Sequence, residues 1–546
     1  MKINKILNCD IIVVGSGIGG LTAAKKAAER GRNVILVTNG KLCGGASYFP
    51  LKGTLGIQAT ADQKEDQEFF KNDIKTIGRG MENPHMIDTY IKDIKESITS
   101  LNEIGFKPWL RNDKRPACFA KYARDIFLIN EWEKAKEEAK IIFKNIENIK
   151  IKEQTKIIKI LKYNNKTAGA VFQSNEGELF IIKAPVIIMA SGGIAGLYEH
   201  NLYPSDVDGS GHVVLLDAGA QLQNMEFIQF IPAFIKPVYN TLFGEHTLKY
   251  CLGMYTHDDK KLFSGIEDKN IKDLWLERSS YAPFSCDFKS SVIDLKMADN
   301  TNGVKLKFHK DLYLDEGEFY KVYLDWLKKS IGIDMCNDEI IVAPFAHSCN
   351  GGVKVSCNGE TNIPGVFAAG EIISGVEGAN RLGGNSVGGA LVFGRRAACT
   401  ADEYIKNNPL ENISDKFLKN EFTNWVNSLE SNNTTKSSSK NDIIKSIKKL
   451  ITEKGGIKRN GEKLKEALIE IEKIKKDYNI KTSDNKIDFE IYFKTEAAKV
   501  LFTAMLNREE SRGAHYREDF PKQSDIVYKI IVFKENGYIK VKKEYN

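Results

Sequence analysis

The sequence has no cysteine pair with the spacing of a metal or redox site. Its nine cysteines are scattered along 546 residues, and none belongs to a C-x-x-C pair, the spacing typical of zinc ribbons, thioredoxin-like proteins and iron–sulfur proteins. We therefore expect no metal site and no iron–sulfur cluster on this chain. An odd, dispersed set of cysteines is typical of reduced thiols, which predicts a cytoplasmic protein.

Long hydrophobic runs are missing as well. No apolar run reaches the ~18 residues that a membrane-spanning helix needs. The first residues, MKINKILNCDIIVVGSG, lack the pattern of a signal peptide. We expect no direct insertion into a membrane, so that any peripheral contact with one would come through a partner.

A strong charge of one sign is also absent. The 79 lysines and arginines and the 72 aspartates and glutamates leave a net charge of +7. So small an excess over this length is not the pattern of a nucleic-acid-binding protein, and we expect no nucleic acid as partner. It is compatible with an anionic small molecule or an acidic redox protein.

Glycine, in contrast, is abundant in three places. Residues 10–37 read as strand, glycine turn, helix and strand, and Gly15, Gly17 and Gly20 form G-x-G-x-x-G. Gly15 permits the tight turn, Gly17 lets a pyrophosphate approach, and Gly20 lets the helix pack on the strand. The second strand ends at Thr38, where many dinucleotide-binding folds place an acidic residue on the ribose. This stretch predicts a dinucleotide-binding domain.

A second glycine-rich loop follows that strand. In KLCGGASYFPLKGTLGIQAT, the residues Gly44, Gly45, Ala46 and Ser47 are small enough to lie against a cofactor. The alternative is a plain surface loop. Farther along, APVIIMASGG resembles another nucleotide-facing strand with Gly192 at its C-terminal end.

The third glycine-rich stretch, residues 344–396, combines a histidine, a strand and the segment GANRLGGNS. The strand VFAAGE delivers Glu371 at its C-terminal end, where parallel α/β sheets present ligand-binding residues. Asn385 and Ser386 lead into a run that predicts a helix whose N-terminus faces the ligand. A glycine-rich turn in an ordinary sheet is the alternative, but the N-terminal glycine motif favours a cofactor site.

Two segments between these stretches have regular patterns. Residues 62–105 have the periodicity of packed amphipathic helices. Residues 140–182 are typical of strands and turns, with turn clusters at 164–165 and 175–177.

The remaining segments predict separate units. Residues 235–338 are rich in aromatics and loops, which indicates an inserted lid domain. From about residue 401 the chain is helical and lysine-rich, with a polar low-complexity loop at 431–442. The tail reads as a β-hairpin that turns at residues 535–537.

In this order, the pieces resemble the flavoprotein family of succinate dehydrogenase, fumarate reductase and L-aspartate oxidase. The matching segments lie between residues 10 and 521 and read VVGSGIGGLTAA, ASGGIAGLY, GAQLQNMEFIQFIP, PFAHSCNGG, FAAGE, GANRLGGNS and REESRGAHYREDFP. The resemblance implies an α/β fold, with a Rossmann-like FAD-binding domain, an inserted α+β capping (lid) domain and a helical C-terminal domain. The implied boundaries are 1–234 and 340–405 for the FAD-binding domain, 235–339 for the capping domain, 406–525 for the helical domain and 526–546 for the hairpin tail.

The resemblance also implies FAD as cofactor. Relatives that attach FAD covalently have a histidine in the loop after the second strand, which reads GGASYFP here, so we expect non-covalent FAD. The residues expected to bind it are Gly15, Ser16, Gly17, Ile18, Gly19, Gly20, Thr38, Asn39, Gly44, Gly45, Ala46, Ser47, Gly192, Gly370, Glu371, Asn385, Ser386 and Val387.

The chemistry of the family is hydride transfer between the flavin and a carbon next to a carboxylate. His347 matches its substrate-carboxylate histidine and Arg381 its carboxylate-clamping arginine, a role that a guanidinium fork suits. A structural histidine and a surface ion pair are the alternatives. The catalytic arginine of the lid has no clean counterpart, and Arg278, displaced from the expected register, is the candidate for it.

Three departures from the family pattern limit the range of substrates that we expect. Relatives read QFHPT where this chain has Ile231 in place of the histidine, the family's GDGH contains Ser210 here, and the histidine of HGANR is Glu377. An imidazole lost and an apolar side chain gained argue against a small dicarboxylate such as fumarate. We therefore expect a bulkier or less charged enoate.

Three functions stay open at this point. The first is a flavin-dependent reductase or dehydrogenase acting on such an enoate, the second is L-aspartate oxidase, and the third is a catalytically degenerate electron carrier. The resemblance implies a small carboxylate substrate and, as electron partner, either an iron–sulfur subunit or a soluble donor.

Overall fold

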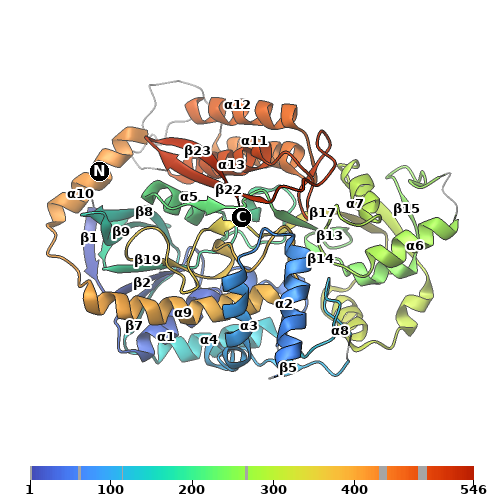
Figure 1. The fold of residues 1–546 in the computed structure, drawn as a ribbon, viewed down its shortest axis with the longest axis horizontal. Helices are drawn as coiled ribbons and strands as arrows, with labels where there is room; N and C mark the ends of the chain where they lie inside the picture. Colours follow the sequence, from blue (N-terminus) through green and yellow to red (C-terminus); the bar gives the residue numbers. More distant parts are fainter. Residues whose placement is uncertain are drawn as a thin grey trace.

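The computed structural model describes residues 3–59, 63–113, 115–264, 268–429, 439–477 and 488–545. One of its sheets is a five-stranded parallel sheet in the order β19-β11-β2-β3-β7, of which β2, β7 and β19 are labelled in the left half of Figure 1. Every residue of β2, β3 and β11 is buried, as a parallel sheet covered on both faces requires. The strands are β2 (Ile11–Val14), β3 (Val34–Val37), β7 (Ile149–Lys152), β11 (Val186–Met189) and β19 (Val366–Ala368).

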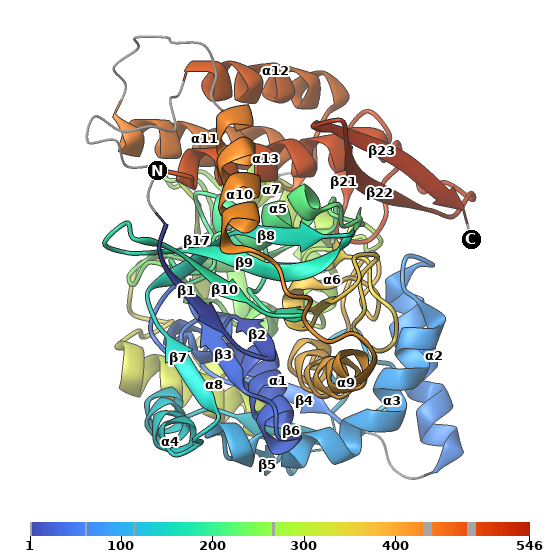
Figure 2. The ribbon, with the colours of Figure 1, turned by 90° about the vertical axis from the view of Figure 1, so that its left-hand side faces the viewer.

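Helices from distant parts of the chain pack beside this sheet. Helix α1 (Ile18–Glu29) directly follows β2 and packs on α9 (Asn385–Asn407), as Figure 2 shows. The two approach closely, since a Cβ on Gly394 would lie 2.7 Å from the Gly19 carbonyl oxygen. The strand, turn, helix and strand predicted for residues 10–37 are confirmed, and the third glycine-rich stretch lies against the first.

A second sheet has the order β1-β10-β9-β8. Asn164 and Asn165 both have positive φ, 49° and 60°, which confirms the predicted turn between two strands. The prediction of strands from residue 140 began too early, because residues 132–144 form α4 (Trp132–Lys144), whose buried residues recur with helical spacing. The strands are β1 (Ile3–Asn8), β8 (Thr155–Tyr163), β9 (Lys166–Ser174) and β10 (Leu179–Lys183).

The helices of residues 64–99 lie outside the five-stranded parallel sheet, and residues 84–99 pack against α9. The helical prediction for 62–105 is confirmed by α2 (Lys64–Gly78) and α3 (Pro84–Thr99). Asn83 caps α3 by accepting a hydrogen bond from the backbone N–H of His85. A small sheet lies beside them, with strands β4 (Leu55–Gln58), β5 (Trp109–Leu110) and β6 (Ile126–Ile129).

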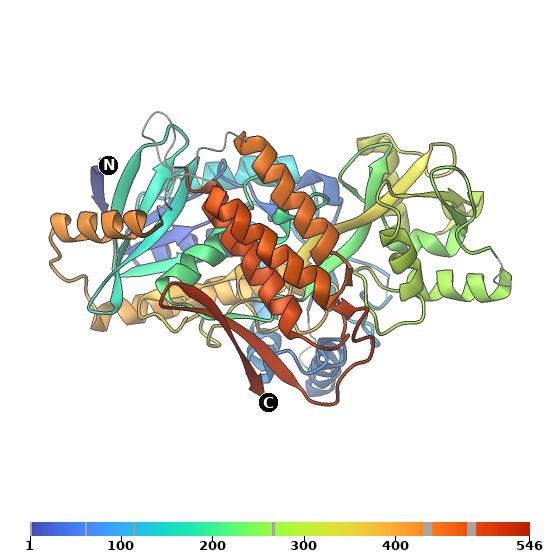
Figure 3. The same cartoon turned by 90° about the horizontal axis from the view of Figure 1, so that it is seen from above.

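The region predicted as a lid has its own sheet and its own apolar core. Its buried cluster runs from Phe234 to Val342 in sequence and is separate from the main core. In Figure 3 this region, coloured green to yellow, lies at one end of the molecule. Two long strands, β13 (Ile228–Lys236) and β17 (Ile340–Cys349), pair with each other. The other elements are β14 (Thr241–Leu242), β15 (Cys251–Tyr255), β16 (Val304–Phe308), α6 (Asp268–Arg278), α7 (Ser291–Ala298) and α8 (Glu318–Trp326).

The C-terminal part is helical and ends in a hairpin, as predicted. Asn536 and Gly537 have φ of 51° and 81°, the left-handed backbone that a two-residue hairpin turn requires. Of the predicted polar loop 431–442, residues 431–438 lie outside the described residues, and Ser439 caps α11. The elements are α10 (Asp415–Leu429), α11 (Lys440–Gly455), α12 (Gly461–Asp477), α13 (Glu490–Asn507), β20 (Lys458–Arg459), β21 (Tyr516–Arg517), β22 (Tyr528–Glu535) and β23 (Tyr538–Tyr545).

The hairpin completes a further sheet, in the order β18-β12-β22-β23. Its short strands β12 (Leu222–Gln223) and β18 (Gly352–Val353), together with α5 (Ser210–Ala218), belong to the cofactor part of the chain. The α/β class with a capping region and a helical C-terminal region is therefore confirmed. Within the described ranges, no helix has the length and apolar character to cross a bilayer, and no three metal-ligand side chains gather.

Candidate active site

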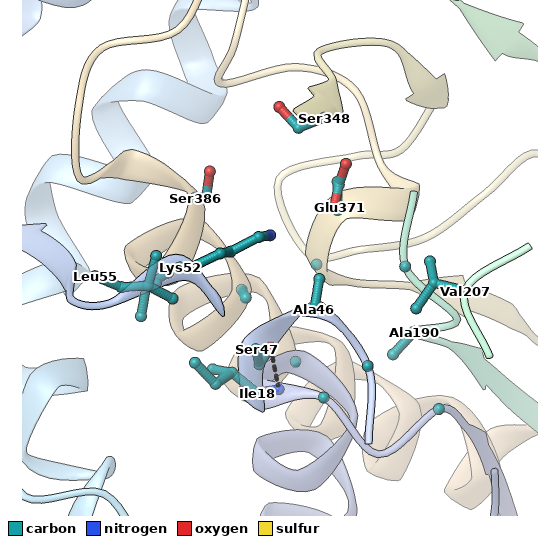
Figure 4. Close-up of a pocket in the computed structure, with 18 of the residues that line it drawn as sticks. Ile18, Ala46, Ser47, Lys52, Leu55, Ala190, Val207, Ser348, Glu371 and Ser386 are labelled. Carbon is teal, nitrogen blue, oxygen red and sulfur yellow. Dashed lines mark hydrogen bonds between the residues drawn. The ribbon is translucent and has the colours of Figure 1, made fainter. Parts of the chain in front are cut away.

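A cavity of about 310 Å³ opens where β2, β11 and β19 end. Ligands of open parallel sheets bind at this edge, beyond the carboxyl ends of the strands. Figure 4 shows Ala46, Ser47, Ala190 and Glu371 around it. The capping region contributes another wall, with apolar residues from several segments, which are Ile231, Leu242, Ala282 and Pro283.

The glycine turn after β2 is built for close backbone approach. Gly15 has φ of 112°, and a Cβ there would lie 2.2 Å from the Ala190 carbonyl oxygen. A Cβ on Gly20 would lie 1.9 Å from the Gly15 carbonyl oxygen, so only glycine fits at either position. Helix α1 begins after Gly17, which has no side chain to cap it, so that backbone N–H groups of the first turn other than that of Ile18 are left for a ligand.

The loop after β3 folds back over this turn. The Ser47 hydroxyl accepts a hydrogen bond from the Ile18 N–H at 3.1 Å, and the Ser16 hydroxyl donates to that of Thr38 at 3.0 Å. Asp206 fixes the loop by accepting a hydrogen bond from the Gly45 N–H at 3.1 Å. The second glycine loop is thus a wall of the cavity and not a plain surface loop.

A second helix N-terminus faces the same cavity. Helix α9 begins after Gly384, which has φ of 89° and provides no side-chain cap. Ser386 and Val387 line the cavity, whereas Asn385 is buried beside it, and its amide nitrogen has no partner in the described part of the chain. Of the eighteen predicted cofactor residues, all but Gly20, Gly44 and Asn385 line the cavity.

Glu371 lies in the turn directly after β19. Its carboxylate accepts a hydrogen bond from the Cys349 N–H at 3.1 Å and another from the Tyr203 hydroxyl. Burial raises the pKa of this carboxyl above its ordinary value. The residue therefore stands at the end of the strand VFAAGE, where the sequence placed it.

His347 and Arg381 come together at the cavity wall. Arg381 donates through Nη2 to His347 Nε2 at 3.1 Å and through Nε to Gln229 Oε1 at 3.0 Å. Because a guanidinium only donates, His347 Nε2 is the acceptor and the imidazole proton sits on Nδ1, which is buried with no partner among the described residues. Burial, with Lys52 and Arg381 nearby, holds the pKa of His347 well below its ordinary value, so the ring is neutral.

Arg278 does not line this cavity. Its guanidinium is fully buried and pairs with Asp294 through Nε at 2.7 Å and Nη2 at 3.0 Å. Further hydrogen bonds go to the Tyr281 and Ala282 carbonyl oxygens. A guanidinium committed to these partners holds the 281–283 segment in place, and this geometry does not support the catalytic role predicted for Arg278.

The three departures from the family pattern fall at or near the cavity. Ile231 lines it, and Ser210 lies at the start of α5 on the same cavity. Glu377 lines an adjoining pocket of about 60 Å³, where burial raises the pKa of its carboxyl to about 8. One of its oxygens has no hydrogen bond from any described residue. Asp208, close to Ser210, pairs with Lys156 at 2.5 Å.

Sequence reasoning missed several lining residues. Lys52, Cys118 and Glu245 line the cavity, yet none is among the residues that the sequence indicated as site residues. Burial raises the pKa of Glu245, whose carboxylate accepts from the Cys118 thiol at 3.6 Å. For Lys52 the signal was a lone lysine inside the loop PLKGTLG, a weak one because loop lysines are ordinarily solvated.

Comparison with known proteins now identifies the family. A model described as "FAD binding domain" matches residues 10–247 and 323–387, and one described as "Fumarate reductase flavoprotein C-term" matches residues 444–544. This chain belongs to the fumarate reductase and succinate dehydrogenase family of flavoproteins. The predicted family and its cofactor, FAD, are therefore confirmed.

The individual relatives of this flavoprotein differ in the activity for which they are named. It is 29% identical over 540 residues to an uncharacterised FAD-dependent oxidoreductase of Methanocaldococcus jannaschii, a match that covers 95% of each chain. It is 28% identical over 522 residues to an L-aspartate oxidase of Bacillus subtilis, covering 94% of this chain and 91% of the relative. A solved E. coli quinol fumarate reductase variant has the same fold, with a TM-score of 0.80 and 21% identity over 99% of this chain and 97% of that one.

Proposed function

We propose that this flavoprotein transfers a hydride between non-covalently bound FAD and the C–C bond next to a carboxylate, reducing an enoate other than fumarate. The observation that carries the proposal is the His347–Arg381 pair at the wall of the cavity that the three glycine-rich stretches line. A guanidinium beside a neutral imidazole is suited to fix a carboxylate, because both offer N–H donors.

The residues present fit FAD. Two helix N-termini face one cavity, and each follows a glycine that provides no side-chain cap, Gly17 and Gly384. The Ser191 hydroxyl is buried at this cavity, and no described residue bonds to it. We propose that the turn 15–20 holds the pyrophosphate, that Glu371 holds ribose or ribityl hydroxyls, and that residues 47 and 386 hold the flavin part. When bound, FAD supplies the two-electron chemistry.

The wall of the cavity that the capping region forms determines which substrate groups fit beyond the substrate carboxylate. Ile231, Leu242, Ala282 and Pro283 are apolar and line the same cavity as Arg381. A second carboxylate on the substrate would lose its hydration against these side chains without gaining a hydrogen bond, which is costly. This supports an enoate with a less charged far end.

The capping region also contributes a carboxyl group that lines the cavity and can hold a proton. It belongs to Glu245, and burial raises the pKa of this carboxyl, so that it is able to hold a proton at a pH where an exposed glutamate has lost it. Reduction of an enoate needs a proton as well as a hydride. We therefore propose Glu245, in place of Arg278, as the group that holds this proton.

Two other functions each have one observation in their favour. The relation to an L-aspartate oxidase supports that activity. The position of Arg278 outside the cavity supports a flavoprotein electron carrier without turnover on small acids, since Arg381 is the only arginine among the described residues that line it. For all three we propose an iron–sulfur subunit or a soluble donor as electron partner.

One experiment separates these functions. The FAD of the purified, flavin-loaded protein is reduced with dithionite without oxygen, and its absorbance is followed as enoates, fumarate among them, are added. Rapid reoxidation by an enoate with an apolar end, and slower reoxidation by fumarate, is the expected result. Reduction of the oxidised protein by aspartate would instead establish the oxidase. If no acid in either direction changes the flavin, the electron carrier is the function.

A further inference from the structure

Lys52 places an ammonium group inside the cavity. It ends the short 3-10 turn Pro50–Lys52, in the second glycine-rich loop and before β4, and is only 6% exposed. Figure 4 shows its side chain reaching across the cavity toward the space between Ser386 and Glu371. Among the described residues its Nζ has no hydrogen bond or ion pair, and it lies 5.5 Å from the centroid of the Tyr203 ring.

The arginine of the cavity is already committed to the protein. Arg381 donates to Gln229 through Nε, to Ser386 through Nη1 and to His347 through Nη2. These three bonds fix the direction of the guanidinium and occupy three of the five N–H groups that an arginine has. The three N–H groups of Lys52, in contrast, donate to no described residue.

The Glu371 carboxylate does not explain this lysine. Glu371 accepts hydrogen bonds from Tyr203 and Cys349 and forms no ion pair with Lys52 within the described part of the chain. A buried ammonium without a partner costs stability, so a residue that only shaped the loop would be better served by an apolar side chain of equal length. The cost is offset where an anionic ligand enters.

We propose that Lys52 binds the substrate carboxylate together with Arg381, so that two positive charges from two distant segments hold one acid group. This rests on the proposed function. It also narrows the substrate to a class: an enoate with one carboxylate, held between Lys52 and Arg381, and an apolar remainder against Ile231 and Leu242. A lysine suits this position because its compact ammonium group can donate hydrogen bonds to a carboxylate that approaches from several directions.

The test uses the oxidised, FAD-loaded protein and probes that cannot react. Butanoate and hexanoate are the saturated monocarboxylates, butyramide is the neutral match, and succinate is the dicarboxylate. Their dissociation constants are measured from the change in flavin absorbance and by calorimetry. Lys52→Met keeps the length and removes the charge, Lys52→Arg keeps the charge, and Lys41→Met, at an exposed lysine of the preceding loop, is the matched control.

We expect Lys52→Met to weaken butanoate and hexanoate binding at least ~10-fold, the scale of a lost hydrogen bond to a charged group, with butyramide unchanged. Lys52→Arg should retain most of the affinity, Lys41→Met all of it, and hexanoate should bind the wild type more tightly than succinate. Equal butanoate affinity in the wild type and Lys52→Met would overturn the proposal. So would absence of carboxylate binding to the wild type, or a Lys52→Met variant that alters only FAD content or flavin potential.

These outcomes are separable from the failure of the proposed function. If carboxylates bind through Lys52 but no enoate reoxidises the reduced flavin, the enoate reductase is wrong and the binding role of Lys52 stands. If an enoate reoxidises the flavin equally well in Lys52→Met, the reductase stands and the inference about Lys52 fails. Thermal unfolding of each variant with FAD bound shows whether a change in affinity comes from a misfolded chain.

Discussion

Two groups of cations in this molecule differ in whether a carboxylate pairs with them, and all of them except the partly exposed Arg381 are buried. In the C-terminal part, Arg508 pairs with Glu226 at 2.5 Å and with Glu510 at 2.7 Å, and Arg512 pairs with Glu510 at 2.8 Å. In the cavity, Lys52 and Arg381 have no carboxylate at ion-pair distance among the described residues. We call the first group, made up of the two arginines 508 and 512 with their two carboxylates, the arginine cluster.

The difference assigns the two groups different tasks. A buried charge with its counterion in the chain can only hold the chain together, whereas one without a counterion is available to a ligand. The arginine cluster does hold parts together, because Arg512 donates to the Arg79 carbonyl oxygen and the Ala514 N–H donates to that of Ala379. Ala514 lies two residues after Arg512 and Ala379 two residues before Arg381, so a backbone hydrogen bond links the segment of the arginine cluster to the segment of Arg381.

The largest effect is expected from breaking the arginine cluster. Arg508→Met leaves Glu226 buried without its ion-pair partner and removes one of the two arginines that pair with Glu510, which should lower the free energy of unfolding by about 3–5 kcal/mol. Chemical denaturation measures it. Arg395→Met is the matched control: its ion pair with Glu96, whose side chain is 77% exposed, should contribute less than about 1 kcal/mol. Similar losses in both variants would contradict the distinction between paired and exposed cations.

Arg278 belongs with the paired cations by its geometry. Arg278→Met should leave Asp294 buried and unpaired, at a cost of about 3 kcal/mol in the free energy of unfolding. Combining it with Asp294→Leu should recover most of that loss, because an apolar pair of similar volume often replaces a buried ion pair without penalty. Chemical denaturation compares the two variants. The double variant should also still reoxidise reduced flavin with an enoate, and a stable double variant without turnover would restore the catalytic role predicted for Arg278.

Arg381 should respond in the opposite way to Arg508. Arg381→Met removes hydrogen bonds to the neutral Gln229, Ser386 and His347 but no ion pair with a described carboxylate, so the free energy of unfolding should fall less than in Arg508→Met. The rate of enoate reduction should fall roughly 10²-fold or more, the cost of losing a charged hydrogen-bonding partner of the ligand. Stopped-flow reoxidation of the reduced flavin measures the rate and thermal unfolding measures the stability. If Arg381→Met strongly lowered the stability but kept the rate of enoate reduction per folded molecule, Arg381 would be a stabilising cation like Arg508 and not a ligand-binding one.

The same distinction explains how much the sequence could predict. The positions of Gly15 and Gly20 were predictable because their task is local: the backbone turns there, and a Cβ would collide with the neighbouring strand or turn. The task of Arg278 was not, because it depends on Asp294, sixteen residues farther along and on another helix. Lys52 was missed for the same reason, since only the packed fold takes a loop lysine out of water.

The smallest effect, and the most specific, is the pH dependence that Lys52 gives to the ligand-free protein. Burial lowers the pKa of Lys52 from 10.5 to about 8, with Glu371 opposing this shift and Arg381 adding to it. Between those two values the unfolded chain holds a proton that the folded chain has lost, so stability rises with pH across this window.

Lys52→Met removes this pH dependence. At pH 7 the free energy of unfolding of Lys52→Met should exceed that of the wild type by roughly 2–3 kcal/mol. This difference should shrink as the pH approaches the ordinary pKa of lysine. Urea denaturation in neutral and in alkaline buffer measures the difference, with Lys41→Met as the control that shows no such trend. A difference that is the same in both buffers would mean that Lys52 already has a counterion in the folded protein. That result would place it among the paired cations and leave Arg381 as the cation of the cavity that is open to a ligand.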